Sequence, residues 1–470
     1  MKRRSFLKAA GLTSIFATTM SGCANLIKSK TANIKIPRRS TASLSDGTTV
    51  DLDQWTAEYV DLWKNTSNNY PFNLKSFDFK TQSHNIYNLN NLGLKLDFEF
   101  SKITVDDPNA KNWITKSRQQ ILKTLAPIFG VAPDVLAKFE KMGLIEALVQ
   151  YFKQAKMIDP SLSPADIFQA GRNVITANAL QIISANKVET HEAILGYSLL
   201  YPYSDNIIDN RNLTNSDKLD FAGRFKSRLE GSQNVEPQNE DEKKIFQMVS
   251  LIEKRYPRSE FPEVYSSLLI IHSAQVESMF QQNIKNLSKV SVNDEFMMKT
   301  FKKGGASVFA DAFLAAGHPS PSFAKFSFGF GVLLQLVDDL QDITIDRKAK
   351  TATIFNIAAA KGEVLDAYAN QLFSFAVQII GSMPSIDSHG TDITREVQSM
   401  LQNGVILLIV EAIESQKHLF GQHYVDNIVD KTTIGSHTNG SLKTIEQKFI
   451  QIFSTSESKI IQFLDLYSQN

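Results

Sequence analysis

The strongest pattern in the chain is a long apolar run that ends in a group of acids. From Phe326 to Val337 nearly every residue is apolar, and Gln335 is the one strongly polar exception. A helix of this composition is apolar on all sides, so we predict that it lies buried in the core. The acids that follow it at once are Asp338, Asp339, Asp342 and Asp346.

The spacing of these acids predicts a metal site at the end of the helix. Asp338, Asp342 and Asp346 follow one another at intervals of four residues, so a helix places them along one face. Carboxylates held there repel one another and lose solvation, which is unfavourable unless cations or hydrogen bonds compensate. The alternative is an ordinary helix that leaves the core and presents its acids to solvent.

A second acidic pair favours the metal site. Residues 196–210, GYSLLYPYSDNIIDN, are again apolar and aromatic before they reach Asp205 and Asp209, which are one helical turn apart. Two such pairs, each at the end of an apolar helix, could face one another across a helical barrel. Hard cations such as Mg²⁺ prefer carboxylate oxygens, with the remaining positions left to water and phosphate.

Both acidic motifs resemble those of known enzymes. The pattern Q-x-x-D-D-x-x-D at Gln335, Asp338, Asp339 and Asp342 resembles the second aspartate-rich motif of the trans-polyprenyl diphosphate synthases. The pattern D-x-x-x-D in residues 205–209 is similar to the first motif of the squalene and phytoene synthases. The wider resemblance, to class I isoprenoid biosynthesis enzymes, begins at about residue 111 and continues to the C-terminus.

The resemblance implies an all-helical bundle that holds three Mg²⁺ ions between the two motifs. In that superfamily the ions bind the diphosphate of an allylic prenyl substrate and help it leave, so that a carbocation forms in an apolar cavity. The implied catalytic metal ligands are Asp205, Asp209, Asp338 and Asp342, with Asp339 and Asp346 as further ligands.

Four other residues are candidate contacts to the diphosphate or the metal site: Arg211, Lys303, Gln335 and Lys350. An arginine fork suits phosphate oxygens, although Arg211 could also be a surface residue at a helix end. Lys303 precedes Gly304 and Gly305, which could admit a ligand or simply break the helix. For Lys350 the alternative is a solvated basic turn.

The chain also departs from the family in several places. It lacks a Gly-Gly-Lys-Arg element near the N-terminus, which binds the second diphosphate in chain-elongating synthases, and it lacks the Asn/Ser/Glu triad of microbial terpene cyclases. A squalene-type second motif would have Asn in place of Asp338 and Arg in place of Gln341. The resemblance therefore leaves the reaction subtype open.

Polar residues interrupt another apolar segment, residues 272–282. His272, Gln275 and Ser278 follow helical spacing there and need partners, either inside the core or from a ligand. Aromatic residues near the two acidic motifs could line a cavity and stabilise a carbocation, but at helical spacing they could equally be core. They are Tyr197, Tyr201, Tyr203, Phe309, Phe313, Phe328 and Phe330.

The first 22 residues are predicted to be an export signal. The segment KRRSFLK at residues 2–8 resembles a twin-arginine motif, and an apolar stretch follows it. Residues 20–23, MSGC, resemble a lipobox, and Cys23 is the only cysteine in the chain, so lipidation is its expected use. The alternative is an uncleaved anchor close to the membrane. The protein is accordingly expected to be an exported bacterial lipoprotein of the cell envelope.

We predict an all-α protein, an isoprenoid-synthase-like helical bundle with a small mixed N-terminal extension. The expected parts are a signal peptide at 1–22, a flexible tether at 23–53, the extension at 54–110 and the helical domain at 111–470. Alternation in residues 92–103 suggests a short strand or hairpin within the extension. After the signal, no apolar run is long enough to suggest a membrane span, and residues 405–410 are expected to be core.

Charge and motifs exclude several classes of function. After residue 22 the chain has 46 basic and 49 acidic residues, and no basic stripe suggests a nucleic-acid partner. No zinc pattern, P-loop, dinucleotide fingerprint or nucleophile elbow is present. The leading hypothesis is a Mg²⁺-dependent enzyme, compatible with a homodimer, that ionises a prenyl diphosphate. The alternative is a non-catalytic lipoprotein whose bundle binds a lipid or a partner protein.

Overall fold

The computed structural model describes residues 39–70, 74–104, 106–208, 213–278, 284, 286–388, 391–435 and 462. Over these residues the protein is all-α, as predicted, with two short antiparallel hairpins. The helices are α1 (Leu52–Asn65), α2 (Phe79–Lys102), α3 (Ala110–Ile128), α4 (Pro133–Lys141), α5 (Leu144–Ile158), α6 (Pro164–Ile183), α7 (Glu192–Ile208), α8 (Asn215–Leu229), α9 (Glu240–Arg255), α10 (Pro262–Ser278), α11 (Asp294–Ala316), α12 (Pro321–Gln341), α13 (Ile343–Ala349), α14 (Ile354–Ala360), α15 (Asp366–Gly381), α16 (Thr394–Ser415) and α17 (Gln422–Ile428). The hairpins pair β1 (Thr41–Ser43) with β2 (Thr49–Asp51) and β3 (Asp387–Ser388) with β4 (Thr391–Asp392), and short 3₁₀ turns are η3 (Leu287–Lys289), η4 (Lys417–Leu419) and η5 (Val429–Lys431).

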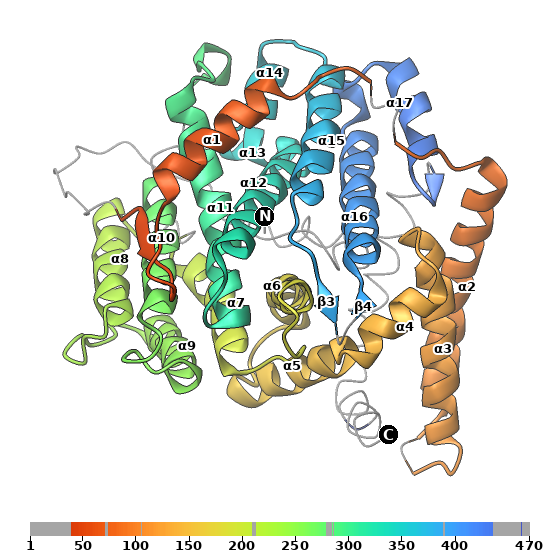
Figure 1. Cartoon of the computed structure of the whole chain (residues 1–470), viewed down its shortest axis with the longest axis horizontal. Helices are drawn as coiled ribbons and strands as arrows, with labels where there is room; N and C mark the ends of the chain where they lie inside the picture. The colour runs from red at the N-terminus through yellow and green to blue at the C-terminus, as the bar shows by residue number, and fades with distance from the viewer. Residues whose placement is uncertain are drawn as a thin grey trace.

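Helix α12 is the centre of the bundle, where it packs against α11, α15 and α16 (Figure 1). Ser320 caps its first turn and Pro321 occupies the first helical position. Every residue from Phe326 to Leu340 is buried, as the apolar pattern predicts.

Glycines let α11 and α12 approach each other closely. A Cβ at Gly304 would lie 2.7 Å from the carbonyl oxygen of Gly331, and one at Gly305 would lie 2.5 Å from the ring of Phe328. Helix α11 runs without interruption through both glycines, so the expected break at this point is wrong. The glycines are explained by helix packing, because larger side chains would separate the two helices.

The first described residues belong to the folded body. Ala42, Leu44 and Val50 of the first hairpin are buried in the main core, and β1 packs against α10. Helix α1 lies across α11 and α12, with Trp55 against the rings of Phe309 and Phe328. The expected flexible tether is therefore wrong for residues 41–53, and α1 is an integral part of the bundle.

Residues 92–102 belong to helix α2, so the strand or hairpin expected at residues 92–103 is wrong. The buried positions of α2, Gln82, Asn85, Leu89 and Leu92, follow one another at three or four residues, which is the period of a helix. That face packs on the segment after α17, where Gln82 Nε2 donates to the carbonyl oxygens of both Val429 and Thr432 at 2.9 Å.

Helix α16 contains the strongly apolar residues 405–410. It is the one helix in the described part of the chain that is long and apolar enough to cross a membrane. However, 72% of its most apolar window is buried inside the protein, and all of residues 405–410 are core. The expectation that this run is a core helix is confirmed by its burial.

Candidate functional site

The predicted acidic site lies at the C-terminal end of α12. Asp338, Asp339 and Asp342 are buried there, with 4 to 8% of each residue exposed. Helix α12 ends at Gln341, but the helical path continues, because the Asp342 N–H donates to the Asp338 carbonyl at 2.9 Å and the Asp346 N–H donates to the Asp342 carbonyl at 2.8 Å. The three acids at four-residue spacing therefore follow one another turn by turn, as predicted from the sequence.

The carboxyls of Asp338 and Asp339 are held in surroundings that disfavour their charge. Burial raises the pKa of Asp338 well above its usual range, and the negative charges of Asp342, Asp339 and Asp346 raise it further. Burial also raises the pKa of Asp339, to about 7. A nearby cation would reverse this effect, because it favours the ionised carboxylates.

Lys303 supplies part of the compensating charge from α11. It is partly buried, and its positive charge lowers the pKa values of both Asp338 and Asp339. Gln335 acts on the same group, because its Nε2 donates to Asp339 Oδ1 at 2.8 Å and lowers the Asp339 pKa. Gln335 itself lies against Gly304, next to Lys303. Gln335, Lys303, Asp342 and Asp346 thus all act on the buried carboxyls of Asp338 and Asp339 through charge or a hydrogen bond.

Among the described residues, no group of three or more His, Cys, Asp or Glu side chains is arranged to hold a metal ion. Within the same residues, Asp339 Oδ2 is buried and has no hydrogen-bond partner. The chemistry of the α12 acids suits Mg²⁺, which binds carboxylate oxygens. A complete site would need the second acidic pair as well.

The structure gives only part of that second pair. Asp205 lies in the last turn of α7, and its side chain is not described. Asp209 and Arg211 lie outside the described residues, as does Cys23. Whether Asp205 and Asp209 face the acids of α12 therefore stays a prediction.

Lys350 follows the last of these acids, Asp346, by four residues, at the end of α13. It is the C-cap of α13, with a left-handed backbone at φ 57° and an exposed side chain. Its carbonyl oxygen accepts from the Ile284 N–H at 3.0 Å. The exposed side chain agrees with the alternative given for Lys350 in the sequence, a solvated basic turn.

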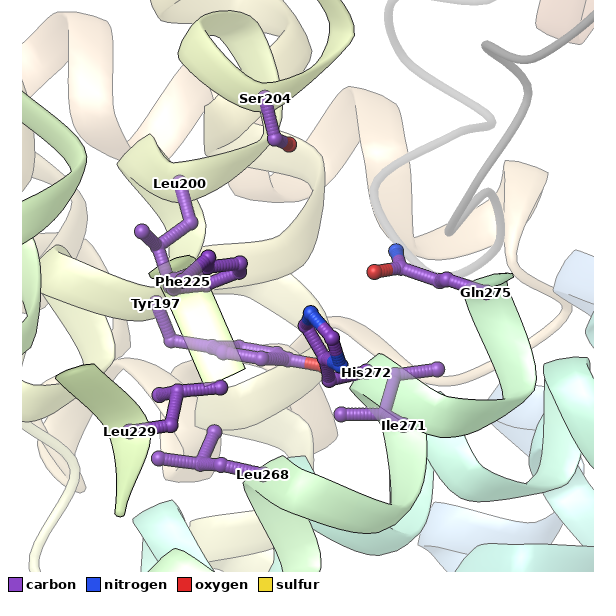
Figure 2. A pocket seen from close by; sticks show the side chains of 9 residues that line it. All are labelled: Tyr197, Leu200, Ser204, Phe225, Leu229, Leu268, Ile271, His272 and Gln275. Atoms are coloured by element: carbon purple, nitrogen blue, oxygen red, sulfur yellow. The ribbon is translucent and has the colours of Figure 1, made fainter. Parts of the chain in front are cut away.

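A small hollow lies between α7, α8 and α10 (Figure 2). It has about 30 Å³ of free space, enough for one or two water molecules. Helix α7 contributes Tyr197, Leu200 and Ser204, helix α8 contributes Phe225 and Leu229, and helix α10 contributes Leu268, Ile271, His272 and Gln275. Two of the three polar residues singled out in this segment, His272 and Gln275, thus line this hollow, whereas Ser278 does not and donates to the Gln275 carbonyl oxygen at 2.8 Å. The leucines and Phe225 on the wall gave no separate signal in the sequence.

His272 is a neutral group in this hollow at neutral pH. Burial lowers its pKa to about 4, and its ring packs edge-on against Phe225 at 5.3 Å between centroids. A neutral imidazole in apolar surroundings can accept or donate one hydrogen bond without adding charge.

Helix α11 connects the hollow to the acidic site. The Tyr197 hydroxyl, on the wall of the hollow, donates to the carbonyl oxygen of Ser307 at 3.3 Å. Ser307 is one helical turn, about 6 Å, beyond Lys303. The acidic end of α12 and the apolar hollow are therefore both in contact with the same short part of α11.

One buried acid, Asp311, was not predicted from the sequence. Asp311, in the middle of α11, is fully buried and accepts from Asn173 Nδ2 of α6 at 3.1 Å. Burial raises its pKa well above the usual range, and the hydrogen bond from Asn173 opposes this only partly. The signal was a single Asp inside the apolar run FADAFLAA, residues 309–316, which could have been recognised as a buried polar position.

Comparison of the chain with models of protein families, with curated proteins and with solved structures finds no match. The resemblance to isoprenoid biosynthesis enzymes therefore rests on the two acidic motifs of the sequence.

Proposed function

We propose that this protein is a Mg²⁺-dependent isoprenoid enzyme that ionises an allylic prenyl diphosphate. The observation that carries the proposal is the buried group of acids at the end of α12, with Lys303 beside it. Such a group is unfavourable in an apolar core unless cations or hydrogen bonds compensate its charge, and diphosphate with Mg²⁺ is a ligand that suits carboxylates and a lysine together.

The roles follow from the chemistry of each residue. Asp338 and Asp342, with Asp205 and Asp209 from the other motif, would hold the metal, and Asp339 and Asp346 would assist them. Bound Mg²⁺ would supply positive charge to the leaving diphosphate. Lys303 would contact diphosphate oxygens, and Gln335 would keep Asp339 oriented through its hydrogen bond.

The apolar hollow offers a place for the hydrocarbon part of a substrate. Its wall is formed largely by leucine, isoleucine and aromatic side chains, and Tyr197 and Phe225 present π faces that favour a nearby cation. At about 30 Å³ it is too small for a prenyl chain, so helices α7, α8 and α10 would have to separate when a substrate binds.

Release of diphosphate tests the proposal directly. The purified full-length protein is incubated with Mg²⁺ and allylic prenyl diphosphates of several lengths, and free diphosphate is measured. Asp205→Asn and Asp338→Asn should each lower the rate by at least about 100-fold, because each removes a charge from the metal site. Asp311→Asn, a change at a buried acid outside the site, should leave the rate within about twofold.

The same experiment can reject the proposal. Release that survives both site substitutions would exclude the assigned acids from the chemistry. If no diphosphate is released and Mg²⁺ does not promote binding of any prenyl diphosphate, the non-catalytic lipid-binding lipoprotein becomes the better explanation.

A further inference from the structure

Helix α2 exposes an unusual number of large apolar side chains. In the described part of the chain, six large hydrophobic residues are strongly exposed, and four of them are on this helix: Phe79, Tyr87, Leu94 and Phe98. The exposed fractions of the last three are 64%, 58% and 60%. Single exposed apolar residues are ordinary, but a group on one element indicates an interaction surface.

Three of these residues share one face of the helix. Tyr87, Leu94 and Phe98 are separated by seven and four residues, which returns each side chain to nearly the same direction. The opposite face is already occupied, because Leu89 and Leu92 are buried. We call Tyr87, Leu94 and Phe98 the α2 stripe.

The α2 stripe lies at the margin of the molecule and is bordered by lysines. Figure 1 shows α2 and α3 side by side at one edge of the protein, and the two helices pack together. Lys80 and Lys102, near the two ends of α2, are exposed, and the Lys102 ammonium lies 3.7 Å from the centre of the Phe98 ring. The Lys102 charge is therefore next to the apolar stripe, and Lys80, seven residues before Tyr87, falls on the same face of the helix.

The charge of this region differs from that of the rest of the protein. Residues 79–128, which comprise α2 and α3, contain seven basic and four acidic residues, a balance of +3. All residues after position 22 contain 46 basic and 49 acidic residues, a balance of −3. The exposed lysines of α3 are Lys111, Lys116 and Lys123.

We propose that the α2 stripe docks on the surface of an anionic bilayer. An apolar stripe with aromatic residues enters the boundary between headgroups and acyl chains, while flanking lysines bind anionic headgroups. A lipid attached at Cys23 would hold the protein near the same surface, and two weak attachments together give stable binding. The docking does not depend on the proposed enzymatic activity.

The proposal is tested by labelling single positions. In the full-length protein with Cys23→Ser, a polarity-sensitive fluorophore is attached to an introduced cysteine at Tyr87, Leu94 or, as the matched control, Val364. Val364 is 57% exposed but belongs to the loop before α15. The protein is mixed with vesicles of phosphatidylglycerol and phosphatidylethanolamine, with or without spin-labelled lipids that quench fluorescence at the membrane.

Docking predicts that the Tyr87→Cys and Leu94→Cys labels become brighter and are quenched by the spin-labelled lipids, whereas the Val364→Cys label does neither. Lys80→Glu with Lys102→Glu should raise the vesicle concentration needed for half of the Leu94→Cys response by at least about 30-fold, because the attraction that each lysine contributes near an anionic surface is lost. Circular dichroism checks that each variant is folded.

Three results would overturn the proposal. One is equal quenching at the control position and at the α2 stripe. Another is a Leu94→Cys label that is already in an apolar environment without vesicles at low protein concentration, which would mean that another part of the chain covers the stripe. The third is a vesicle-independent change that grows with protein concentration, together with a doubled mass in light scattering, which would identify a second copy as the partner.

Discussion

Two buried acids on neighbouring helices are disfavoured in the same way but have different surroundings. Burial raises the pKa values of both Asp338 on α12 and Asp311 on α11 well above the usual range. Asp338 has three other aspartates and Lys303 within electrostatic reach, whereas Asp311 is hydrogen-bonded by Asn173. Burial alone therefore does not distinguish a candidate metal site from an isolated core acid, but clustering of carboxylates does.

The largest expected effect is a change in the free energy of unfolding with pH, caused by Asp339, the neighbour of Asp338. Its pKa is raised to about 7 in the folded protein, from 3.8. A raised pKa gives stability that is fully present below pH 4 and is lost as the pH rises through 7. In the absence of divalent cations, this loss should amount to about 4 kcal/mol of the free energy of unfolding.

Urea denaturation between pH 4 and 8, in EDTA, measures that loss. The wild-type curve should fall relative to the Asp339→Asn curve as the pH rises, because the variant has no carboxyl to ionise at this position. Parallel curves for the two proteins would show that Asp339 is not held in the protonated form.

The next largest effect is the stability that Mg²⁺ adds, which should depend on Asp338 of α12 but not on Asp311 of α11. At neutral pH and a Mg²⁺ concentration 100-fold above its Kd, the wild-type protein should gain about 2.7 kcal/mol of stability. Asp338→Asn should lose most of this gain, since one carboxylate of the cluster is gone, and Asp311→Asn should retain it. Thermal unfolding with Mg²⁺, and with NaCl at equal ionic strength, provides the measurement; equal gains in both variants would contradict a metal site on α12.

Substitution of the isolated acid should stabilise the protein. Asp311→Asn keeps the shape of the side chain and removes the charge that burial disfavours, so the free energy of unfolding at pH 8 should rise by about 1–3 kcal/mol. The gain should shrink as the pH falls toward 4, because ionisation of the Asp311 carboxyl in the unfolded chain, which burial opposes in the folded protein, then contributes less to unfolding. Asp311→Leu is the informative companion, since it also removes the partner of Asn173 Nδ2 and should stabilise less. A destabilised Asp311→Asn protein at pH 8 would indicate a cation beside this residue.

The central part of the fold could be predicted because its pattern was unambiguous. An apolar run from Phe326 to Val337 has few alternatives to a buried helix, and acids at four-residue spacing keep their alignment in any helix. The turn by turn arrangement of Asp338, Asp342 and Asp346 is therefore present although α12 formally ends at Gln341.

The N-terminal part was harder because local patterns were ambiguous there. Trp55, Tyr59 and Trp63 are four residues apart and mark the buried face of α1, but the Asn-rich surroundings concealed this period. In α2, Leu94 and Phe98 are exposed apolar residues on the face opposite the core. Together with buried residues such as Leu92 they give every second position an apolar residue, which is the pattern of a strand. Contacts between distant segments, such as Tyr197 with Ser307, have no signature in a single sequence.

The smallest expected effect concerns Gln335, whose side chain has two opposing contributions. Its Nε2 stabilises the ionised Asp339 carboxylate, while its Oε1 is buried and has no hydrogen-bond partner among the described residues. Gln335→Met, of similar size, removes both, so the two contributions largely offset each other at pH 5, where Asp339 is protonated. At pH 8 the lost hydrogen bond to the carboxylate should dominate and destabilise the variant by about 1 kcal/mol. A difference from wild type that does not change between pH 5 and pH 8 would mean that Gln335 does not act on the charge of Asp339, and the hydrogen bond would then have only a packing role.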